Sequence, residues 1–328
     1  MKTAIVGAGV IGTIHARILS EQGRSICAIC DTDEGKARSL AKASAPNARI
    51  YADYADMLAH EEIDVVHICT PHYLHVGQAI YALERGVNVL CEKPMCAHPD
   101  ELSVILEAEK RTGAKFGVVH QNRYNAATLF ALDFLRERKV TSGHADVVWS
   151  RNEKYFSDAP WRGKLYEAGG GALINQALHT LDLAMLFCGM PSEVTASSEI
   201  NVPREGVEVE DTVCASFTGG AAEFSFFATI NSAENHPTRI TLTLEGGQEL
   251  TVYQKSVMLD DKVIFTDDGS MHGFVKSYYG NAHGALFDDF YDCAATGREF
   301  TLNASEAARV MRLIFAVYAS CGEKVYIK

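Results

Sequence analysis

The first 31 residues constrain the fold of this chain most strongly. Residues 2–6 form an apolar run that predicts a buried strand, and the sequence Gly-Ala-Gly-Val-Ile-Gly follows directly at residues 7–12. A helical pattern over about 13–21 and a second apolar strand over 25–30 come next, and that strand ends at Asp31. Strand, glycine turn and helix in this order predict the first unit of a doubly wound parallel sheet.

The glycines and the acidic residue predict a dinucleotide site. Gly7 permits the tight turn, Gly9 lets a pyrophosphate approach the backbone, and Gly12 lets the helix pack closely on the strand. Free N–H groups and the dipole at the start of the helix attract phosphate. An acidic side chain about twenty residues on accepts hydrogen bonds from ribose hydroxyls. No arginine stands next to Asp31, which favours NAD over NADP. The predicted contacts here are Gly7, Gly9, Val10, Ile11, Gly12 and Asp31.

Strands and helices continue to alternate as far as residue 119. Predicted helices at about 34–43, 54–59, 74–84 and 100–112 separate predicted strands at 49–51, 64–69, 86–90 and 115–119. Repeated units of this kind specify a parallel, doubly wound (Rossmann) sheet. We assign residues 1–121 to this α/β domain.

The pattern changes after a predicted helix at 126–138. Segments rich in Thr, Val and Phe predict strands at 145–150, 193–200, 207–217, 221–230, 238–244 and 249–252, and helical patterns cover 172–188, 283–296 and 304–321. A run of strands with few helices between them indicates a mainly antiparallel sheet. Residues 122–328 are therefore expected to form an α+β domain.

Composition excludes several classes of partner. The 328 residues include 30 Lys and Arg against 42 Asp and Glu, for a net charge of −12. This balance argues against nucleic acid or an anionic membrane, since both need a basic face. We see no secretory signal and no apolar run long enough to span a bilayer. Nine cysteines in such a chain suggest a reducing compartment, so a cytoplasmic location is expected.

Cys91-Glu92-Lys93-Pro94 closes the predicted strand at 86–90 and puts a lysine at the strand's carboxyl end. Ligands of open α/β sheets bind at that end. A lysine that is partly desolvated and near a cationic ring loses its proton more easily than a free amine. Lys93 is the first candidate for acid–base chemistry. The alternative is a surface lysine before a turn-forming proline.

A second polar group lies in the predicted helix over 172–188, which follows Gly169-Gly170-Gly171. Asn175, His179 and Asp182 are spaced by four and three residues and so share one helix face. His179 is either a core histidine satisfied by its neighbours or an imidazole oriented toward a substrate hydroxyl.

Several motifs in order resemble the Gfo/Idh/MocA family of NAD(P)-dependent oxidoreductases, which includes glucose–fructose oxidoreductase and inositol dehydrogenase. The resemblance covers essentially the whole chain. It rests on GAGVIG at 7–12, Thr70-Pro71, Glu92-Lys93-Pro94, Gln121-Asn122-Arg123-Tyr124, the stretch 169–183, and the closing segment 284–318.

The resemblance implies that Lys93 and His179 are the catalytic pair at the nicotinamide, and that the Lys93–Pro94 peptide bond is cis. Many members of the family carry aspartate where this chain has Asn175, which leaves Asn175 as a hydrogen-bonding positioner. Some branches, including dehydrogenases of UDP-linked amino sugars, share the asparagine and a Trp-Arg-Gly like that at residues 161–163. This similarity does not assign the substrate.

The resemblance also implies further contacts, for each of which ordinary packing or surface exposure is the alternative. The expected cofactor contacts include Thr70, Pro71, His72, His75, Glu92, Lys93 and Gln121. The expected substrate contacts are Lys93, Arg123, Tyr155, Trp161, Arg162, Asn175, His179 and His283, and Tyr124 and Tyr279 also fall in segments near the cleft.

No metal is expected. His72 and His75 lack further ligands, and Cys27 and Cys30 point to opposite faces of a strand, where they act as small core residues.

Together these features predict an NAD(P)-dependent dehydrogenase, with NAD preferred, that oxidises a secondary alcohol of a sugar, cyclitol or sugar derivative. Two alternatives stay open: a reductase of a keto-sugar or related carbonyl, and a non-catalytic regulator that binds a dinucleotide or sugar. By resemblance, a homodimer or homotetramer is expected.

Overall fold

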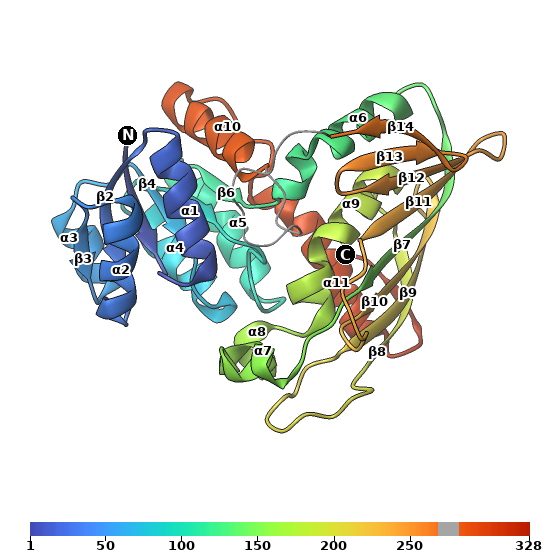
Figure 1. Cartoon of the computed structure of the whole chain (residues 1–328), viewed down its shortest axis with the longest axis horizontal. Helices are drawn as coiled ribbons and strands as arrows, with labels where there is room; N and C mark the ends of the chain where they lie inside the picture. Colours follow the sequence, from blue (N-terminus) through green and yellow to red (C-terminus); the bar gives the residue numbers. More distant parts are fainter. Residues whose placement is uncertain (268–281) are drawn as a thin grey trace. The chain divides into compact units, whose positions relative to one another are not determined.

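The computed structural model describes residues 1–267 and 282–328, so the predicted contact Tyr279 lies outside the described residues. The chain divides into two compact units (Figure 1). The first comprises residues 1–120 and 283–308, and the second comprises 121–282 and 309–328.

The first unit contains a six-stranded sheet in which every neighbouring pair is parallel, as the sequence predicts. Its order is β3-β2-β1-β4-β5-β6. The strands are β1 (Lys2–Val6), β2 (Ser25–Cys30), β3 (Arg49–Tyr51), β4 (Val65–Ile68), β5 (Asn88–Cys91) and β6 (Phe116–Val118). The helices between them are α1 (Val10–Glu21), α2 (Glu34–Ser44), α3 (Tyr54–His60), the 3₁₀ turn η1 (His72–Leu74), α4 (His75–Leu83) and α5 (Glu101–Thr112).

The first unit also includes residues 283–308, with α10 (His283–Thr296), which corrects the continuous second domain predicted over 122–328. The Val118 amide of β6 donates a hydrogen bond to the Leu302 carbonyl at 2.9 Å. A Cβ on Gly117 would lie 2.8 Å from the rings of Phe290 and Phe300, so the bare backbone of β6 lets both rings pack there. The sequence pattern predicts the helix α10 but does not indicate that this helix belongs to the first unit.

The second unit contains a nine-stranded sheet in the order β14-β13-β12-β11-β7-β10-β9-β8-β15. Among the strands that the structure describes in this sheet, only β7 and β10 pair in parallel, which confirms the mainly antiparallel prediction. The helices α6 (Ala126–Leu135) and α9 (Leu178–Cys188) pack against strands of this sheet (Figure 1). The strands are β7 (Val140–Val148), β8 (Glu193–Glu199), β9 (Thr212–Thr218), β10 (Glu223–Thr229), β11 (Arg239–Leu244), β12 (Glu249–Tyr253), β13 (Ser256–Leu259), β14 (Lys262–Thr266) and β15 (Lys324–Tyr326).

Some boundaries in the second unit differ from the sequence prediction. β13, β14 and β15 were not predicted because they are short, and β14 and β15 bury no side chain fully, so neither shows a clear alternation. β9 begins at Thr212 and not at residue 207. The reason is Asp211, whose carboxylate accepts from the amides of Asn201 and Val202 at 3.0 and 2.8 Å and so fixes a loop before the strand. The last helix, α11, runs from Ala304 to Ser320.

Among the described residues, no helix combines the length and the apolar character needed to cross a membrane.

Candidate active site

The glycine turn after β1 is shaped for a ligand. Gly7 has φ +95°, and a Cβ there would lie 2.5 Å from the Cys69 carbonyl oxygen. A Cβ on Gly12 would lie 1.9 Å from the Gly7 carbonyl oxygen. At Gly9 an added Cβ would meet no described atom within 4 Å. Two glycines are therefore required by packing, whereas the third keeps open space beside the backbone, which suits a pyrophosphate.

The amide groups at the start of α1 are open as well. Gly9 is the N-cap, no side chain of the described residues caps the helix, and Val10 is 60% exposed. Uncapped amides at a helix N-terminus bind anions. Asp31 lies beside this turn because its Oδ2 accepts from the Ala8 amide at 2.7 Å, while Oδ1 accepts from Asp33 at 2.8 Å. These groups fit a dinucleotide.

Lys93 follows β5 at the carboxyl edge of the same sheet. Cys91 and Glu92 are buried and Lys93 is half-buried. The Lys93–Pro94 peptide bond is cis, which confirms the prediction made from the family resemblance.

His75 connects this turn to the loop after β4. Its Nδ1 lies 2.7 Å from the Pro94 carbonyl oxygen and its Nε2 lies 2.9 Å from the Thr70 carbonyl oxygen. Burial lowers the pKa of His75, although both carbonyls oppose that shift. The imidazole is buried, so we expect it to fix the Thr70-Pro71 loop rather than to contact a ligand itself. His72, also buried, has its ring centroid 5.8 Å from that of His75.

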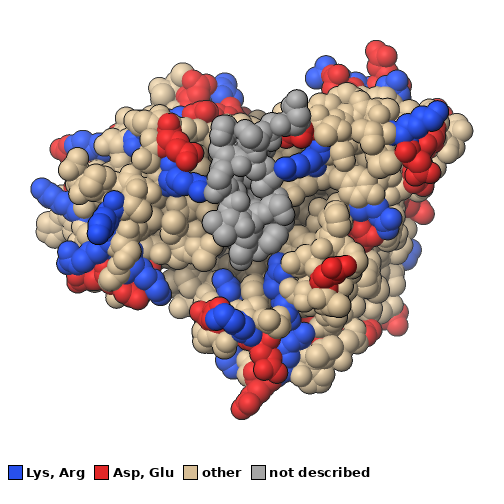
Figure 2. Space-filling view, in the orientation of Figure 1, with Lys and Arg blue, Asp and Glu red and all other residues tan. Residues whose placement is uncertain are grey.

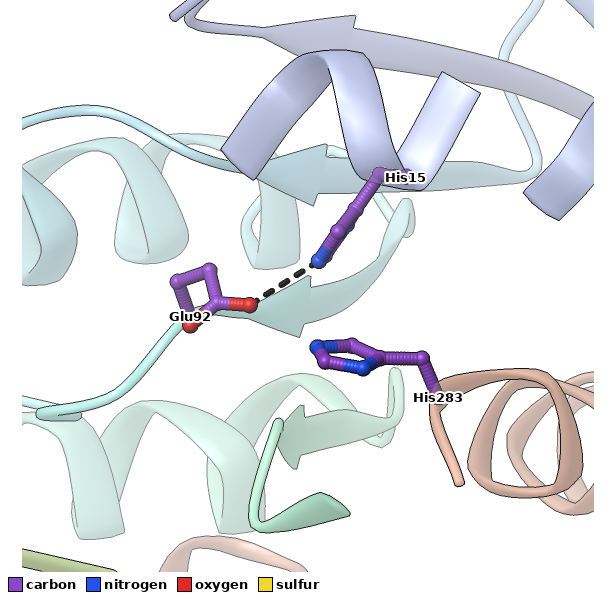
Figure 3. Close-up of side chains that lie close together, drawn as sticks. All are labelled: His15, Glu92 and His283. Carbon is purple, nitrogen blue, oxygen red and sulfur yellow. Dashed lines mark hydrogen bonds and ion pairs between the residues drawn. The ribbon is translucent and has the colours of Figure 1, made fainter. Parts of the chain in front are cut away.

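Glu92 lies in a buried polar cluster with His15 and His283 (Figure 3). Its Oε1 is 2.9 Å from His15 Nε2, and its Oε2 accepts from the Lys93 amide at 3.2 Å. Burial would raise the pKa of Glu92, but the hydrogen bond and charge of His15, with smaller contributions from His283 and Lys93, hold it at about 2. Glu92 is therefore a carboxylate at neutral pH.

His283 begins α10 and is 1% exposed. Burial lowers its pKa to about 4, so the imidazole is neutral at pH 7. One ligand atom each from His15, Glu92 and His283 lie within 4.8 Å of one another, a spacing compatible with a metal ion. The substrate contact predicted for His283 stays a prediction, and this burial gives it no support.

In the second unit, the segment that carries Asn175 and His179 begins as a π-helix, η4 (Ala172–Ala177), and continues as α9. The sequence predicts one uninterrupted helix here. Single π turns inside helices occur frequently at functional sites. The segment starts at Gly170 and Gly171, where an added Cβ would lie 2.1 Å from the Tyr318 hydroxyl oxygen and 1.9 Å from the Glu210 carbonyl oxygen, respectively.

Glu210 is the hydrogen-bond acceptor for the backbone amides at the start of η4. Its carboxylate accepts from the Gly171 amide at 2.7 Å and the Leu173 amide at 3.0 Å, and from the Tyr318 hydroxyl at 2.9 Å. Its own carbonyl accepts from the Ala172 amide at 2.9 Å. Burial raises the pKa of Glu210, and these hydrogen bonds only partly offset it. Glu210 thus anchors the helix that presents Asn175 and His179.

The three polar residues of this helix have different surroundings. Asn175 and His179 are half-buried, whereas Asp182 is 1% exposed. Asp182 pairs with Arg123 of the 3₁₀ turn η2 (Gln121–Tyr124), whose Nε and Nη2 lie 2.7 and 2.6 Å from the two carboxylate oxygens. This pairing gives Arg123 a structural role, and its predicted substrate contact stays a prediction. Gln121, an expected cofactor contact, is buried in the same turn.

Three predicted substrate residues come together near η4. Tyr155 lies on α7 (Glu153–Ser157), and Trp161 and Arg162 lie on η3 (Pro160–Gly163), which precedes α8 (Leu165–Ala168). Arg162 Nη1 donates to the Tyr155 carbonyl at 3.0 Å, and its guanidinium carbon is 4.5 Å from the Tyr155 ring centroid and 5.9 Å from that of Trp161. Gln176 of η4 donates to the Tyr155 hydroxyl at 2.7 Å. The group is a polar and aromatic surface tied to the His179 segment.

Sequence reasoning missed several residues that support these groups. His67 is a polar residue inside the apolar strand β4, and that position was a usable signal. Glu210 stands in an ordinary run of acidic residues, and Tyr291 and Tyr318 stand in amphipathic helices. Nothing local distinguishes those three.

On the face shown in Figure 2, Lys and Arg side chains are interspersed with Asp and Glu over the described surface.

Comparisons with known proteins identify the family. Residues 1–120 match an oxidoreductase family with an NAD-binding Rossmann fold, GFO/IDH/MocA, and residues 139–248 match the GFO/IDH/MocA C-terminal domain. An uncharacterized oxidoreductase of Rhizobium meliloti is 30% identical over 66% of this chain and 66% of its own length. D-Glucoside 3-dehydrogenase of Escherichia coli (strain K12) is 30% identical over 79% of this chain and 73% of its own length.

Among solved structures, the WlbA dehydrogenase of Bordetella pertussis, in complex with NADH and UDP-GlcNAcA, is similar with a TM-score of 0.86 and 26% identity. The match covers 100% of this chain and 98% of that one. Both halves of the chain thus match one family, and the chain belongs to the GFO/IDH/MocA oxidoreductases with an NAD-binding Rossmann domain.

Proposed function

We propose that this protein oxidises a secondary alcohol of a sugar, cyclitol or sugar derivative and transfers the hydride to NAD. The observation that carries the proposal is in the first unit. An open glycine turn follows β1, and a half-buried lysine follows β5, at the carboxyl edge of one parallel sheet. That edge is where such sheets bind their ligands.

The residues at the turn would hold the cofactor. Amides at the start of α1 and the space beside Gly9 suit the pyrophosphate, and Asp31 suits the ribose hydroxyls. A carboxylate there repels a 2′-phosphate, which favours NAD over NADP. NAD, when bound, supplies the acceptor for the hydride.

Lys93 and His179 would handle the proton of the alcohol. The carbon that gives up a hydride becomes a carbonyl carbon, and its hydroxyl proton passes to Lys93 or to His179. Lys93 acts either as the base itself or as a cation that acidifies the hydroxyl while His179 takes the proton. Asn175 has no charge to contribute, so we assign it a hydrogen bond to the substrate.

The surface formed by Tyr155, Trp161 and Arg162 would contact the rest of the substrate. Aromatic faces and a guanidinium suit a polar ring compound. The bound UDP-GlcNAcA of the Bordetella protein keeps nucleotide sugars among the candidates, and the Escherichia coli relative keeps simple glucosides.

Two alternatives keep the same site. One is reduction of a keto-sugar or related carbonyl, because hydride transfer is reversible. The other is a regulator that binds a dinucleotide or sugar without turnover; the presence of both Lys93 and His179 favours the enzyme.

We expect a homodimer or homotetramer, which sedimentation would establish.

The test is NADH formation by the purified protein with NAD and with NADP, across inositols, free pyranoses and nucleotide sugars. We expect turnover with one substrate class and a strong preference for NAD. If no compound of the panel gives NADH although the protein binds NAD, the reductive direction or the regulator would be favoured. Equal rates with both cofactors would contradict the role given to Asp31.

A further inference from the structure

A buried chain of hydrogen bonds ends on the glutamate next to Lys93, entirely within the first unit. Thr3 Oγ1 lies 2.6 Å from the Tyr291 hydroxyl, which lies 3.0 Å from His67 Nε2. His67 Nδ1 lies 2.9 Å from His15 Nδ1, and His15 Nε2 lies 2.9 Å from Glu92 Oε1. None of these five residues is more than 6% exposed. They come from β1, α10, β4, α1 and the turn after β5.

The direction of every bond in this chain follows from one proton. A neutral imidazole carries a proton on only one nitrogen. When His15 is neutral and Glu92 accepts from its Nε2, His15 Nδ1 is bare and must accept from the Nδ1–H of His67. His67 Nε2 is then bare and accepts from the Tyr291 hydroxyl, whose oxygen accepts from Thr3. Burial keeps the pKa of His67 well below its usual value, so this imidazole stays neutral.

The surroundings hold the two rings in register. The Phe287 ring lies edge-on to His15 and His67, with centroids 4.8 and 4.9 Å away. The Arg24 guanidinium lies 4.0 Å from the Tyr291 ring centroid, where a positive charge makes the hydroxyl a better donor. The chain is therefore closely packed and has a polar donor at its far end.

We propose that Thr3, Tyr291, His67 and His15 form a one-way hydrogen-bond chain that fixes the Glu92 carboxylate, and that Glu92 in turn fixes the backbone of Lys93. His15 and His67 are then positioning residues for the reaction. The link to Lys93 is the hydrogen bond from the Lys93 amide to Glu92 Oε2. The catalytic meaning of the chain rests on the function proposed above, whereas the chain itself does not.

Other titratable groups also face this end of the chain and set the charge around it. They are His283 of α10, His75 of α4, the thiols of Cys69 and Cys91, and Lys93 itself. The Cys69 thiol lies 3.4 Å from His15 Nδ1 but extends no bond toward Glu92.

Nitrogen NMR of the ¹⁵N-histidine-labelled protein tests the chain without a substrate. At about pH 8, above the ordinary histidine pKa of about 6.5, we expect His15 protonated on Nε2 and His67 protonated on Nδ1, the rarer tautomer. Substitutions of each histidine by glutamine assign the signals. Protonation of His67 on Nε2 would overturn the proposal, because the chain would then run away from Glu92.

Glu92→Gln gives the sharpest variant. The Lys93 amide needs an acceptor, so the glutamine carbonyl should face it and the glutamine NH₂ should face His15. That arrangement forces His15 to accept at Nε2, and we expect both His15 and His67 to switch tautomer. Glu101→Gln is the matched control, because Glu101 accepts from the amides of Ala97 and His98 in the same region outside the chain. It should leave both tautomers unchanged.

The same variants test the link to Lys93. Lysines methylated with ¹³C give one signal each, and Lys93→Arg identifies that of Lys93. We expect this signal to shift in Glu92→Gln and not in Glu101→Gln. An unshifted Lys93 signal would overturn the positioning role, even if Lys93 proved essential for turnover. If Glu92→Gln does not fold, the tautomers of the unaltered protein still decide the direction of the chain.

Spectra with and without a chelator separate this proposal from a metal site. The proposal predicts identical spectra. Histidine signals that change when the chelator is added would show an ion held by His15, Glu92 and His283, and would overturn the hydrogen-bond chain.

Discussion

Two glycine-rich turns in this chain lead into helices, and the backbone amides at the two helix starts differ in their partners. At Gly7 to Gly12 the amides at the start of α1 are left without a side-chain cap, and Gly9 faces space free of described atoms. At Gly169 to Gly171 the first amides of η4 are taken by the carboxylate and carbonyl of Glu210. Similar local sequences thus produce one open helix start and one filled by the protein itself.

The difference teaches what a glycine turn needs in order to bind a ligand. A helix N-terminus attracts anions only while its amides have no internal partner. In the first unit the anion has to come from outside, which fits a pyrophosphate. In the second unit the Glu210 carboxyl group accepts hydrogen bonds from these amides, so the turn serves to place Asn175 and His179.

Among the variants that test this comparison, Gly171→Ala should have the largest effect, a loss of stability. Its Cβ would lie 1.9 Å from the Glu210 carbonyl oxygen, which is backbone and cannot move aside. Overpacking of this kind costs about 3 kcal/mol of unfolding free energy. Urea unfolding measures it. Gly77→Ala in α4, where a Cβ meets no described atom within 4 Å, is the control and should cost nothing.

Glu210→Gln should cause the second largest loss of stability. The amide keeps one acceptor oxygen, so one of the three hydrogen bonds from Gly171, Leu173 and Tyr318 loses its acceptor. A buried donor without a partner costs about 1–3 kcal/mol. Tyr318→Phe removes only the hydroxyl and should cost less. Equal stability of Glu210→Gln and the unaltered protein would contradict the anchoring role.

Gly9→Ala tests the open turn of the first unit. The added methyl finds free space in the protein, so thermal stability should not change. The methyl would occupy the place proposed for the pyrophosphate, and we expect the Kd for NAD to rise at least about tenfold, or about 1.4 kcal/mol. Calorimetric titration measures the Kd. An unchanged Kd would show that the open turn is not the binding site.

The smallest effects concern pH, where the two buried glutamates should act with opposite sign. The pKa of Glu210 is raised by burial, so its contribution to stability is complete below 4.5 and declines as pH rises through the raised pKa. The pKa of Glu92 is held at about 2, so its contribution is present above 4.5 and declines as pH falls toward 2.

Unfolding curves of Glu210→Gln, Glu92→Gln and the unaltered protein, measured at a series of pH values, would show whether the contribution of each glutamate to stability rises or falls with pH. A shared sign would contradict the cause assigned to one of the two shifts.

Much of the first unit could be predicted because its signals are local. An apolar strand, three spaced glycines and Asp31 follow from sequence order alone, and the alternating elements imply the parallel sheet. The position of Lys93 could be predicted because it directly follows the buried strand β5, whose carboxyl end lies at the edge of the sheet.

The missing parts depend on contacts between distant segments. The return of α10 to the first sheet rests on Gly117, whose lack of a side chain makes room for Phe290 and Phe300. His15, His67 and Tyr291 form a chain only because α1, β4 and α10 meet. Glu210 anchors η4 from a loop 39 residues away from Gly171. No local pattern contains such pairings.

The most direct test of the central claim compares Lys93→Met with the unaltered protein, using the first compound of the panel that the latter oxidises. We expect turnover to be abolished while the Kd for NAD stays nearly the same, because the methionine keeps most of the length of the side chain and loses its amine. Lys110→Met, at an exposed position of α5, is the control and should keep full activity. If Lys93→Met retained most of the rate, Lys93 would not be the acid–base residue of this site.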